Sequence, residues 1–231
     1  MNDFMQYDQN YASKLNTSLM YCYLWMFVGL MLTAMTSIFL YSTNLLLFAL
    51  VRMPFLMTLI LIAQLGVVFA MSFFQRKLSA TALKVMFVLY SLLTGVTFTT
   101  LGYVYPLGTI GLAFIVSAVF FLSLFAVGMT TKKDFSNIGM ICIAALFALV
   151  VTQIIMMIFR VSMDTRIMSM IGLLIFTGIT IWDVQRARVV LGSEMLYGEE
   201  QDKAIIFFAL NLYLDLINIF LKILSLLNKK K

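Results

Sequence analysis

Residues 209–222 read Ala209-Leu-Asn211-Leu-Tyr213-Leu-Asp215-Leu-Ile-Asn218-Ile-Phe-Leu-Lys222, and this stretch decides the fold. It belongs to the hydrophobic run 204–227, which is long enough for a membrane helix but carries a carboxylate near its middle. The polar residues of this stretch follow one another at intervals of four, three and four positions, which places them on one stripe of an α-helix. They are Asn211, Asp215, Asn218 and Lys222.

The carboxylate of Asp215 is the group that the rest of the chain must accommodate. An acid at the centre of a membrane helix costs about 2.5 to 3.5 kcal/mol on insertion scales, so a chain that keeps one is expected to shield it from lipid. The stripe therefore predicts a polar interior that is enclosed by other membrane helices. Lys222, near the end of the run, is expected to extend its ammonium group to the membrane interface.

The composition identifies an all-α, polytopic membrane protein. Of the 231 residues, 63% are hydrophobic and 11% are charged, whereas charged residues make up about a quarter of a soluble domain. A membrane helix needs about 20 mostly apolar residues, and the chain holds seven such runs, at about 20–41, 55–74, 80–104, 110–130, 138–159, 167–186 and 204–227. We predict one seven-helix membrane domain over 20–228, with a polar N-terminal segment, 1–19, and a basic tail, 229–231.

The distribution of Lys and Arg predicts the orientation in the membrane. The polar start of the chain lacks the pattern of a cleavable signal peptide, so the first run is expected to remain as an anchor. Lys and Arg number eight in the N-terminal segment and the loops on its side, and three in the opposite loops, before the tail is counted. This excess favours a cytoplasmic N-terminus. The side of the tail depends on whether the last run crosses the membrane, as its length favours, or re-enters.

The absence of histidine narrows the chemistry. It removes Ser-His and Cys-His catalysis, His-ligated metal sites and imidazole proton relays. An intramembrane aspartyl protease would need a Gly-x-Gly-Asp turn, which the sequence lacks. We therefore expect no enzymatic activity and no bound cofactor. The net charge of +6 lies in loops and at the C-terminus, which points to anionic lipid headgroups and not to nucleic acid.

Two aspartates are the candidate functional residues. Of the ten acidic residues, only Asp183 and Asp215 fall within hydrophobic runs, and no Lys or Arg lies deep in a run to neutralise them. Two carboxylates in a low-dielectric interior resist carrying two negative charges, so the pair is expected to share a proton near neutral pH and to titrate as a unit. A change of pH would then make or break the hydrogen bond between them and gate a path. When ionised, the pair offers oxygen ligands of the kind that Ca²⁺ prefers.

Structural interpretations stand beside this one. Asp183 falls late in its run, so it can mark the end of a helix and form a local ion pair with Arg186, one turn further on. Asp215 can make a structural hydrogen bond to a neighbouring helix, and Asn211 and Asn218 belong to a residue type that more often holds helices together than binds ligands. The acidic stretch 189–203 has the composition of a solvated connection.

Three segments resemble the bacterial branch of the Bax inhibitor-1 family. They are Thr131-Lys132-Lys133-Asp134, the segment from Ile171-Gly172-Leu-Leu-Ile-Phe176-Thr177-Gly178 to Asp183-Val-Gln185-Arg186, and the segment from Ala209 to Phe220. The order and spacing of the seven runs agree with that family as well. The resemblance therefore covers nearly the whole chain, and the two acid-bearing segments are its specific part.

The resemblance implies a fold in which six helices surround a central, acid-bearing seventh, and a pH-sensitive Ca²⁺ leak through the membrane. In that family an aspartate pair in the sixth and seventh spans acts as the pH sensor, and Asp183 and Asp215 match its positions. Two features depart from the family pattern. Val184 stands where family members often carry a hydroxyl residue, and the second run has no charge to act as a basic latch, for which Arg52 is the nearest candidate.

Two functions of different classes follow. The first is a passive, pH-gated cation pathway in the bacterial inner membrane, in which Asp183 and Asp215 form the gate and transient Ca²⁺ ligands. The second is a non-conducting regulatory protein that binds a membrane partner, such as a protease or a cell-death or stress factor. The lipid bilayer is a partner in both.

Overall fold

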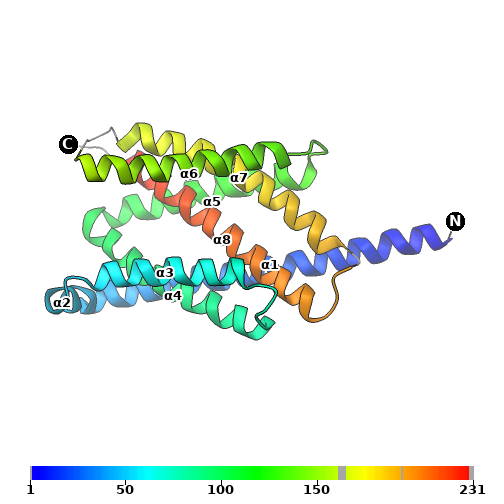
Figure 1. Cartoon of the computed structure of the whole chain (residues 1–231), viewed down its shortest axis with the longest axis horizontal. Helices are drawn as coiled ribbons and strands as arrows, with labels where there is room; N and C mark the ends of the chain where they lie inside the picture. Colours follow the sequence, from blue (N-terminus) through cyan, green and yellow to red (C-terminus); the bar gives the residue numbers. More distant parts are fainter. Residues whose placement is uncertain (1, 161–164, 194, 229–231) are drawn as a thin grey trace. The chain divides into compact units, whose positions relative to one another are not determined.

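The computed structural model describes residues 2–160, 165–193 and 195–228, with side chains from Ser13 onward except at Met157. All regular structure in these residues is helical (Figure 1). The helices are α1 (Asn2–Thr43), α2 (Leu45–Arg52), α3 (Leu56–Phe73), α4 (Ala80–Val104), α5 (Leu107–Thr130), α6 (Ser136–Phe159), α7 (Thr165–Gly192) and α8 (Glu199–Leu227).

Seven of these helices are long and apolar enough to cross a membrane, so the predicted number and order of spans are confirmed. The differences lie at the helix ends. Helices α1, α7 and α8 are longer than their apolar runs, because flanking polar residues continue the helix. The short helix α2 lies in the connection that was predicted at 42–54 and follows Asn44, whose φ of 52° is left-handed. Asparagine tolerates this conformation better than most residues.

Helix α8 is the most buried of the seven spans. Within its most apolar window 72% of the residues are buried, against 50% or less in the other spans. This burial is expected of the helix that the others were predicted to surround. Helix α8 is also unbroken over 29 residues, or about 44 Å, which exceeds the thickness of the hydrocarbon core. An unbroken helix has no turn at which the chain could re-enter, so its geometry favours the crossing alternative.

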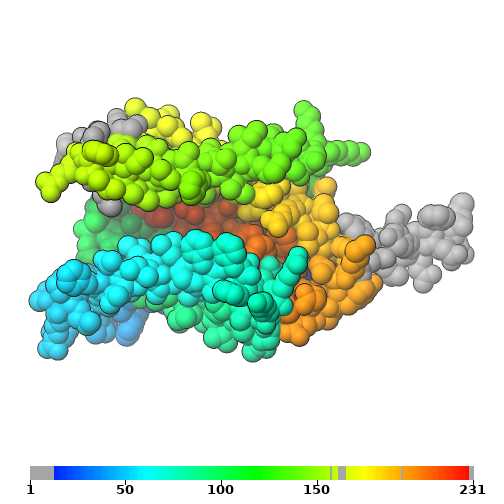
Figure 2. Space-filling view, in the orientation of Figure 1, coloured from blue at the N-terminus to red at the C-terminus, as the bar shows by residue number. Residues whose placement is uncertain are grey.

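Helix α6 shows how apolar the outer surface is. Only 6% of its most apolar window is buried, and its Phe147 side chain is 72% exposed. Figure 2 shows side chains of α6 on the visible surface. A surface of this kind would be unfavourable in water but is not in lipid, whose chains are as apolar as leucine. The chain is therefore a multi-pass membrane protein.

The chain divides into two compact units. Unit 1 comprises Met1–Pro106 and Val189–Tyr213, and unit 2 comprises Leu107–Arg188 and Leu214–Lys231. Helices α7 and α8 each contribute to both units. The predicted site residues Asp183, Asp215 and Asn218 belong to unit 2, and Asn211 belongs to unit 1.

In unit 1, α1 and α3 both pack on α4. The rings of Trp25 and Tyr213 both meet the ring of Phe87 edge to face, with centroids 6.1 and 5.8 Å apart. The Tyr213 hydroxyl lies 2.6 Å from the Thr33 hydroxyl, which itself donates to the carbonyl oxygen of Gly29. The Thr33 hydroxyl also lies 3.0 Å from the carbonyl oxygen of Ser91, and either hydroxyl of the Thr33–Tyr213 pair can be the donor. This satisfied hydrogen bond fixes α8 to α1 inside an apolar core.

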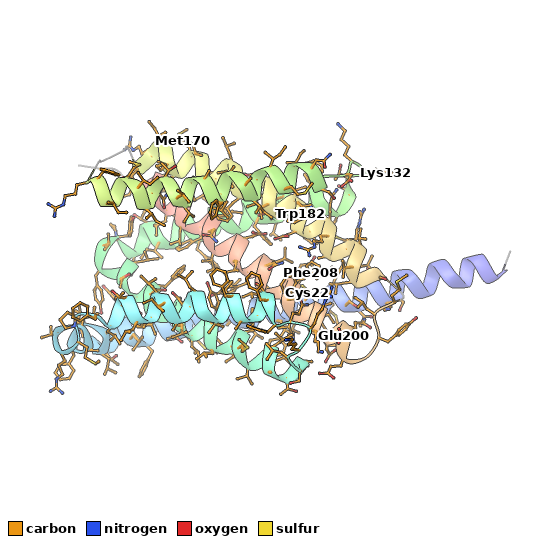
Figure 3. All side chains as sticks on the ribbon, viewed as in Figure 1. Cys22, Lys132, Met170, Trp182, Glu200 and Phe208 are labelled. Carbon is orange, nitrogen blue, oxygen red and sulfur yellow. The ribbon has the colours of Figure 1, made fainter. Side chains whose placement is uncertain are left out.

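The connection between α7 and α8 exposes much of its described part, as its composition predicts, but some of its acidic side chains bind α4. At the start of α8, near the labelled Glu200 in Figure 3, the Glu199 carboxylate accepts a hydrogen bond from the backbone N–H of Ala80, at 3.0 Å. Asp202 forms a salt bridge of 3.0 Å with Lys84 on α4. Glu199 and Asp202 therefore bind the first turns of α4, whereas Glu200 pairs with Lys203 of its own helix. Composition cannot show this, because a carboxylate in water and one that caps another helix have the same sequence signature.

Replacing Lys14 with methionine is expected to loosen this connection. The Lys14 ammonium donates to the carbonyl oxygens of Ser193 and Leu196, both at 2.7 Å, and lies 4.3 Å from the centroid of the Tyr197 ring. Charge-assisted hydrogen bonds contribute about 1.5 to 3 kcal/mol, so amide hydrogens in 195–198 should exchange about tenfold faster. Hydrogen exchange measured by mass spectrometry checks this.

Lys132 offers a matched control, since it is an exposed lysine in the connection between α5 and α6 (Figure 3). Its replacement with methionine should leave exchange in 195–198 unchanged. Equal exchange rates in the Lys14 variant and the wild type would show that the ammonium does not hold the connection.

Candidate functional site

Asp183 lies well inside α7. The helix continues for nine residues beyond it, or about 14 Å, and the side chain is 6% exposed. The alternative in which Asp183 marks a helix end is therefore wrong. The end of the apolar run predicted the end of the helix too early. The polar residues that follow Asp183 have the composition of a loop, but they continue α7.

Close packing between α5 and α7 fixes the segment that carries Asp183. A Cβ atom on Gly128 of α5 would lie 2.8 Å from the Cβ of Val184 and 3.0 Å from the carbonyl oxygen of Ile181. Only glycine permits this approach. Val184, which is fully buried, thus serves as the surface on which α5 packs.

Asp215 lies on α8 with 3% of its side chain exposed, and its carboxyl group is within hydrogen-bonding reach of the Thr180 hydroxyl of α7. The Thr180 hydroxyl also lies 2.7 Å from the carbonyl oxygen of Phe176, to which it can donate. It can therefore donate to an ionised Asp215, or accept from a protonated Asp215 while it donates to the carbonyl. Sequence reasoning missed Thr180. Its position three residues before Asp183, on the same face of α7, was the available signal.

The two carboxylates act on one another. The charge of Asp183 is felt at Asp215, and Oδ2 of Asp215 is a buried oxygen without a hydrogen-bond partner among the described residues. A buried, unsatisfied polar atom costs about 1 to 3 kcal/mol, and more when it is charged. Protonation or a bound cation would remove that cost. The structure thus buries both acids on α7 and α8 and leaves one oxygen of Asp215 without a hydrogen-bond partner among the described residues.

Arg186 approaches the pair from the exposed side of α7. Its guanidinium lies 5.4 Å from the ring centroid of Trp182, which is labelled in Figure 3, and its charge acts on Asp183. A nearby cation favours an ionised carboxylate.

The site does not resemble a resident metal centre. Within the described part of the chain, no group of three or more acidic, cysteine or histidine side chains could hold a metal ion. Ca²⁺ takes six to eight oxygen ligands, and two carboxylates supply at most four. Water and hydroxyl or carbonyl oxygens would have to complete the shell, which suits an ion in passage.

The remaining predicted residues play less direct parts. Asn218 donates from Nδ2 to the carbonyl oxygen of Leu214 in its own helix, at 2.8 Å, so this bond does not join two helices. Asn211 is half-buried on α8. The Arg52 guanidinium lies over the Phe48 ring at the end of α2, 4.3 Å from its centroid, and its role as a latch stays a prediction.

Comparisons with known proteins agree with this architecture. The family model described as "Inhibitor of apoptosis-promoting Bax1" matches residues 15–231. An uncharacterized protein of Deinococcus radiodurans is 35% identical over the whole of this chain and 98% of its own length. The inner membrane protein YbhL of Escherichia coli K12 is 31% identical over 94% of this chain and 93% of its own length. The seven spans, the aspartates on the last two of them and these matches together show that the chain belongs to the Bax inhibitor-1 family of membrane proteins.

Proposed function

We propose that this protein is a passive, pH-sensitive pathway for cations, with Ca²⁺ as the main permeant ion and the pair of Asp183 and Asp215 as its gate. One observation supports the proposal most directly. Two buried carboxylates on neighbouring membrane helices act on each other, and one oxygen of Asp215 has no hydrogen-bond partner among the described residues. Intramembrane acids are costly and commonly mark ion pathways and proton relays.

The gate follows from the number of protons on the pair. With one proton shared, a hydrogen bond joins α7 to α8 and a single negative charge remains. When that proton is lost at higher pH, the two carboxylates repel each other and together attract a divalent cation. Flux is therefore expected to rise with pH. The Thr180 hydroxyl can bond Asp215 in either state, so α7 keeps one contact with α8 throughout.

The proposal includes a place and an orientation. The excess of Lys and Arg on the N-terminal side favours a cytoplasmic N-terminus. The printed name of the relative YbhL places that protein in an inner membrane, and we extend this location to the present chain.

Purified protein in liposomes tests the proposal. Ca²⁺ entry is measured with a trapped dye, between about pH 5 and pH 8, against empty liposomes. We expect flux that changes by about tenfold over this range, which corresponds to about 1.4 kcal/mol. Flux equal to that of empty liposomes at every pH, from protein that remains folded, would contradict a conducting role. That result, with retained binding to a membrane protease or stress factor, would favour the non-conducting regulator.

A further inference from the structure

In unit 2, α7 and α8 run antiparallel and meet along a seam of polar contacts. The first contact joins Asp215 to Thr180, and the last joins the hydroxyls of Ser225 and Ser169, 2.8 Å apart. As the residue number rises by ten along α8, it falls by eleven along α7. The polar seam, defined by these contacts, thus leads from the acid pair toward the end of unit 2 where α7 begins and α8 ends.

Lys222 lies on this seam, between the two contacts. A Cβ atom on Gly172 of α7 would lie 2.6 Å from Cε of Lys222 and 3.3 Å from its Nζ. The lysine therefore crosses the backbone of α7 at a place where glycine leaves room, and it is only half-exposed. The Lys222 stem thus packs against the Gly172 backbone of α7, and the extension of its ammonium to the membrane interface stays a prediction.

Among the described residues, Lys222 has no carboxylate neighbour on the Ser169–Ser225 side of the acid pair. Among the described residues of unit 2, the carboxylates are those of Asp134, Asp183 and Asp215. Lys222 follows Asp215 by seven residues, a rise of about 10.5 Å along the helix, and among the described residues no salt bridge joins the two.

We propose that Lys222 sets a positive potential in the polar seam and thereby limits how fast cations move between the acid pair and the Ser169–Ser225 end. The inference rests on the proposed cation pathway and identifies a second determinant of its selectivity. A unit charge about 10 Å from a cation, in a partly hydrated protein interior, opposes its passage by about three- to tenfold. The effect grows with the charge of the ion, so Ca²⁺ is slowed more than Na⁺. The flexible lysine stem lets the ammonium move aside, so the barrier slows flux without closing the path.

Ion flux in liposomes gives the first test. Lys222→Met keeps the length of the side chain and removes its charge, and Lys222→Arg keeps the charge. We expect Ca²⁺ flux to rise about three- to tenfold in the methionine variant, and Na⁺ flux to rise less. The arginine variant should match the wild type within about twofold. Unchanged flux of both ions in the methionine variant of a conducting protein would overturn the proposal, because a packing role does not distinguish ions by charge.

A second test does not depend on conduction. Ser225→Cys is introduced into a chain whose Cys22 and Cys142 are replaced with alanine, and its reaction with cationic and anionic methanethiosulfonates of similar size is timed in membranes. The anionic reagent should react faster while Lys222 is present, and this preference should be lost with Lys222→Met. A preference that is the same with and without Lys222, or no reaction at all, would overturn the proposal whatever the flux.

The two tests separate the two ideas. Suppose that neither the wild type nor Lys222→Met carries cations, but the reagent preference at position 225 depends on Lys222. The proposed cation pathway is then refuted, while the positive potential that Lys222 sets in the polar seam is supported. If the wild type conducts and the preference does not depend on Lys222, the pathway stands and the role of Lys222 is refuted.

Discussion

Asparagine in place of Asp215 is expected to remove the pH dependence of Ca²⁺ flux while the protein stays folded. The amide has the shape of the carboxyl group and can donate from Nδ2 to Asp183, so it imitates the protonated acid at every pH. Since the variant cannot lose that hydrogen, the bond between α7 and α8 persists and the second negative charge never develops. Flux should be low and constant within about twofold between about pH 5 and pH 8, where the wild type changes about tenfold.

The remaining variants of this series assign the effect to the pair. Asp183→Asn should also flatten the pH profile, and the double variant should add little, because the two groups titrate as one unit. Asp202→Asn is the matched control, since it changes a half-exposed aspartate on the same helix, which is bound to Lys84. It should keep the wild-type profile. A pH dependence that survives in Asp215→Asn would refute the gate, provided that size-exclusion profiles of the two proteins agree.

Leucine in place of Gly128 is expected to disrupt unit 2. The new Cβ would lie 2.8 Å from the Cβ of Val184 and 3.0 Å from the carbonyl oxygen of Ile181, and the rest of the side chain has no space. Because one of these contacts is backbone, rotamer changes cannot relieve it. Overpacking costs about 1 to 3 kcal/mol and occasionally more, and the upper end applies here. The midpoint of thermal unfolding in detergent should fall by several degrees, about what 2 to 3 kcal/mol produces in a chain of this size.

The same helix supplies the control for this variant. Gly111 also lies on α5, and a Cβ at that position would have no atom within 4 Å. Gly111→Leu should leave the midpoint unchanged or raise it, because leucine favours a helix over glycine by about 0.8 kcal/mol. If both leucine variants melt at the wild-type temperature, the approach of α5 to α7 is not a constraint on the fold. Gly128→Leu should lose pH-dependent flux as well as stability, because it displaces Val184, the residue next to Asp183.

The sequence was sufficient for the architecture of the spans. Runs of about 20 apolar residues leave few alternatives to membrane helices, and all seven appear in the predicted order. The acid of Asp215 likewise predicted that α8 would be buried, because burial in protein is the main escape from the cost of a charge in lipid. The number of spans and the burial of α8 are properties of single helices, so the residues of each helix are enough to predict them.

The helix ends were harder to predict. Apolar residues are needed only where a helix contacts lipid, so an apolar run can end before its helix does. Helix α7 continues from Asp183 through polar residues to Gly192. Counting along the apolar run alone therefore put Asp183 near the end of its helix. The backbone hydrogen bonds of α7 place it well inside.

The contacts between helices came from the folded structure. Asp183 and Asp215 are 32 positions apart, and periodicity gives the face of each helix but not which face meets which. That choice depends on where two backbones can approach, as at Gly128 and Gly172, whose neighbours cannot be read from the chain. The contacts of Asp215 with Thr180 and of Lys222 with the Gly172 backbone follow from this packing. The sequence thus supplied the buried charges, and the close approach of the helices determined which groups face them.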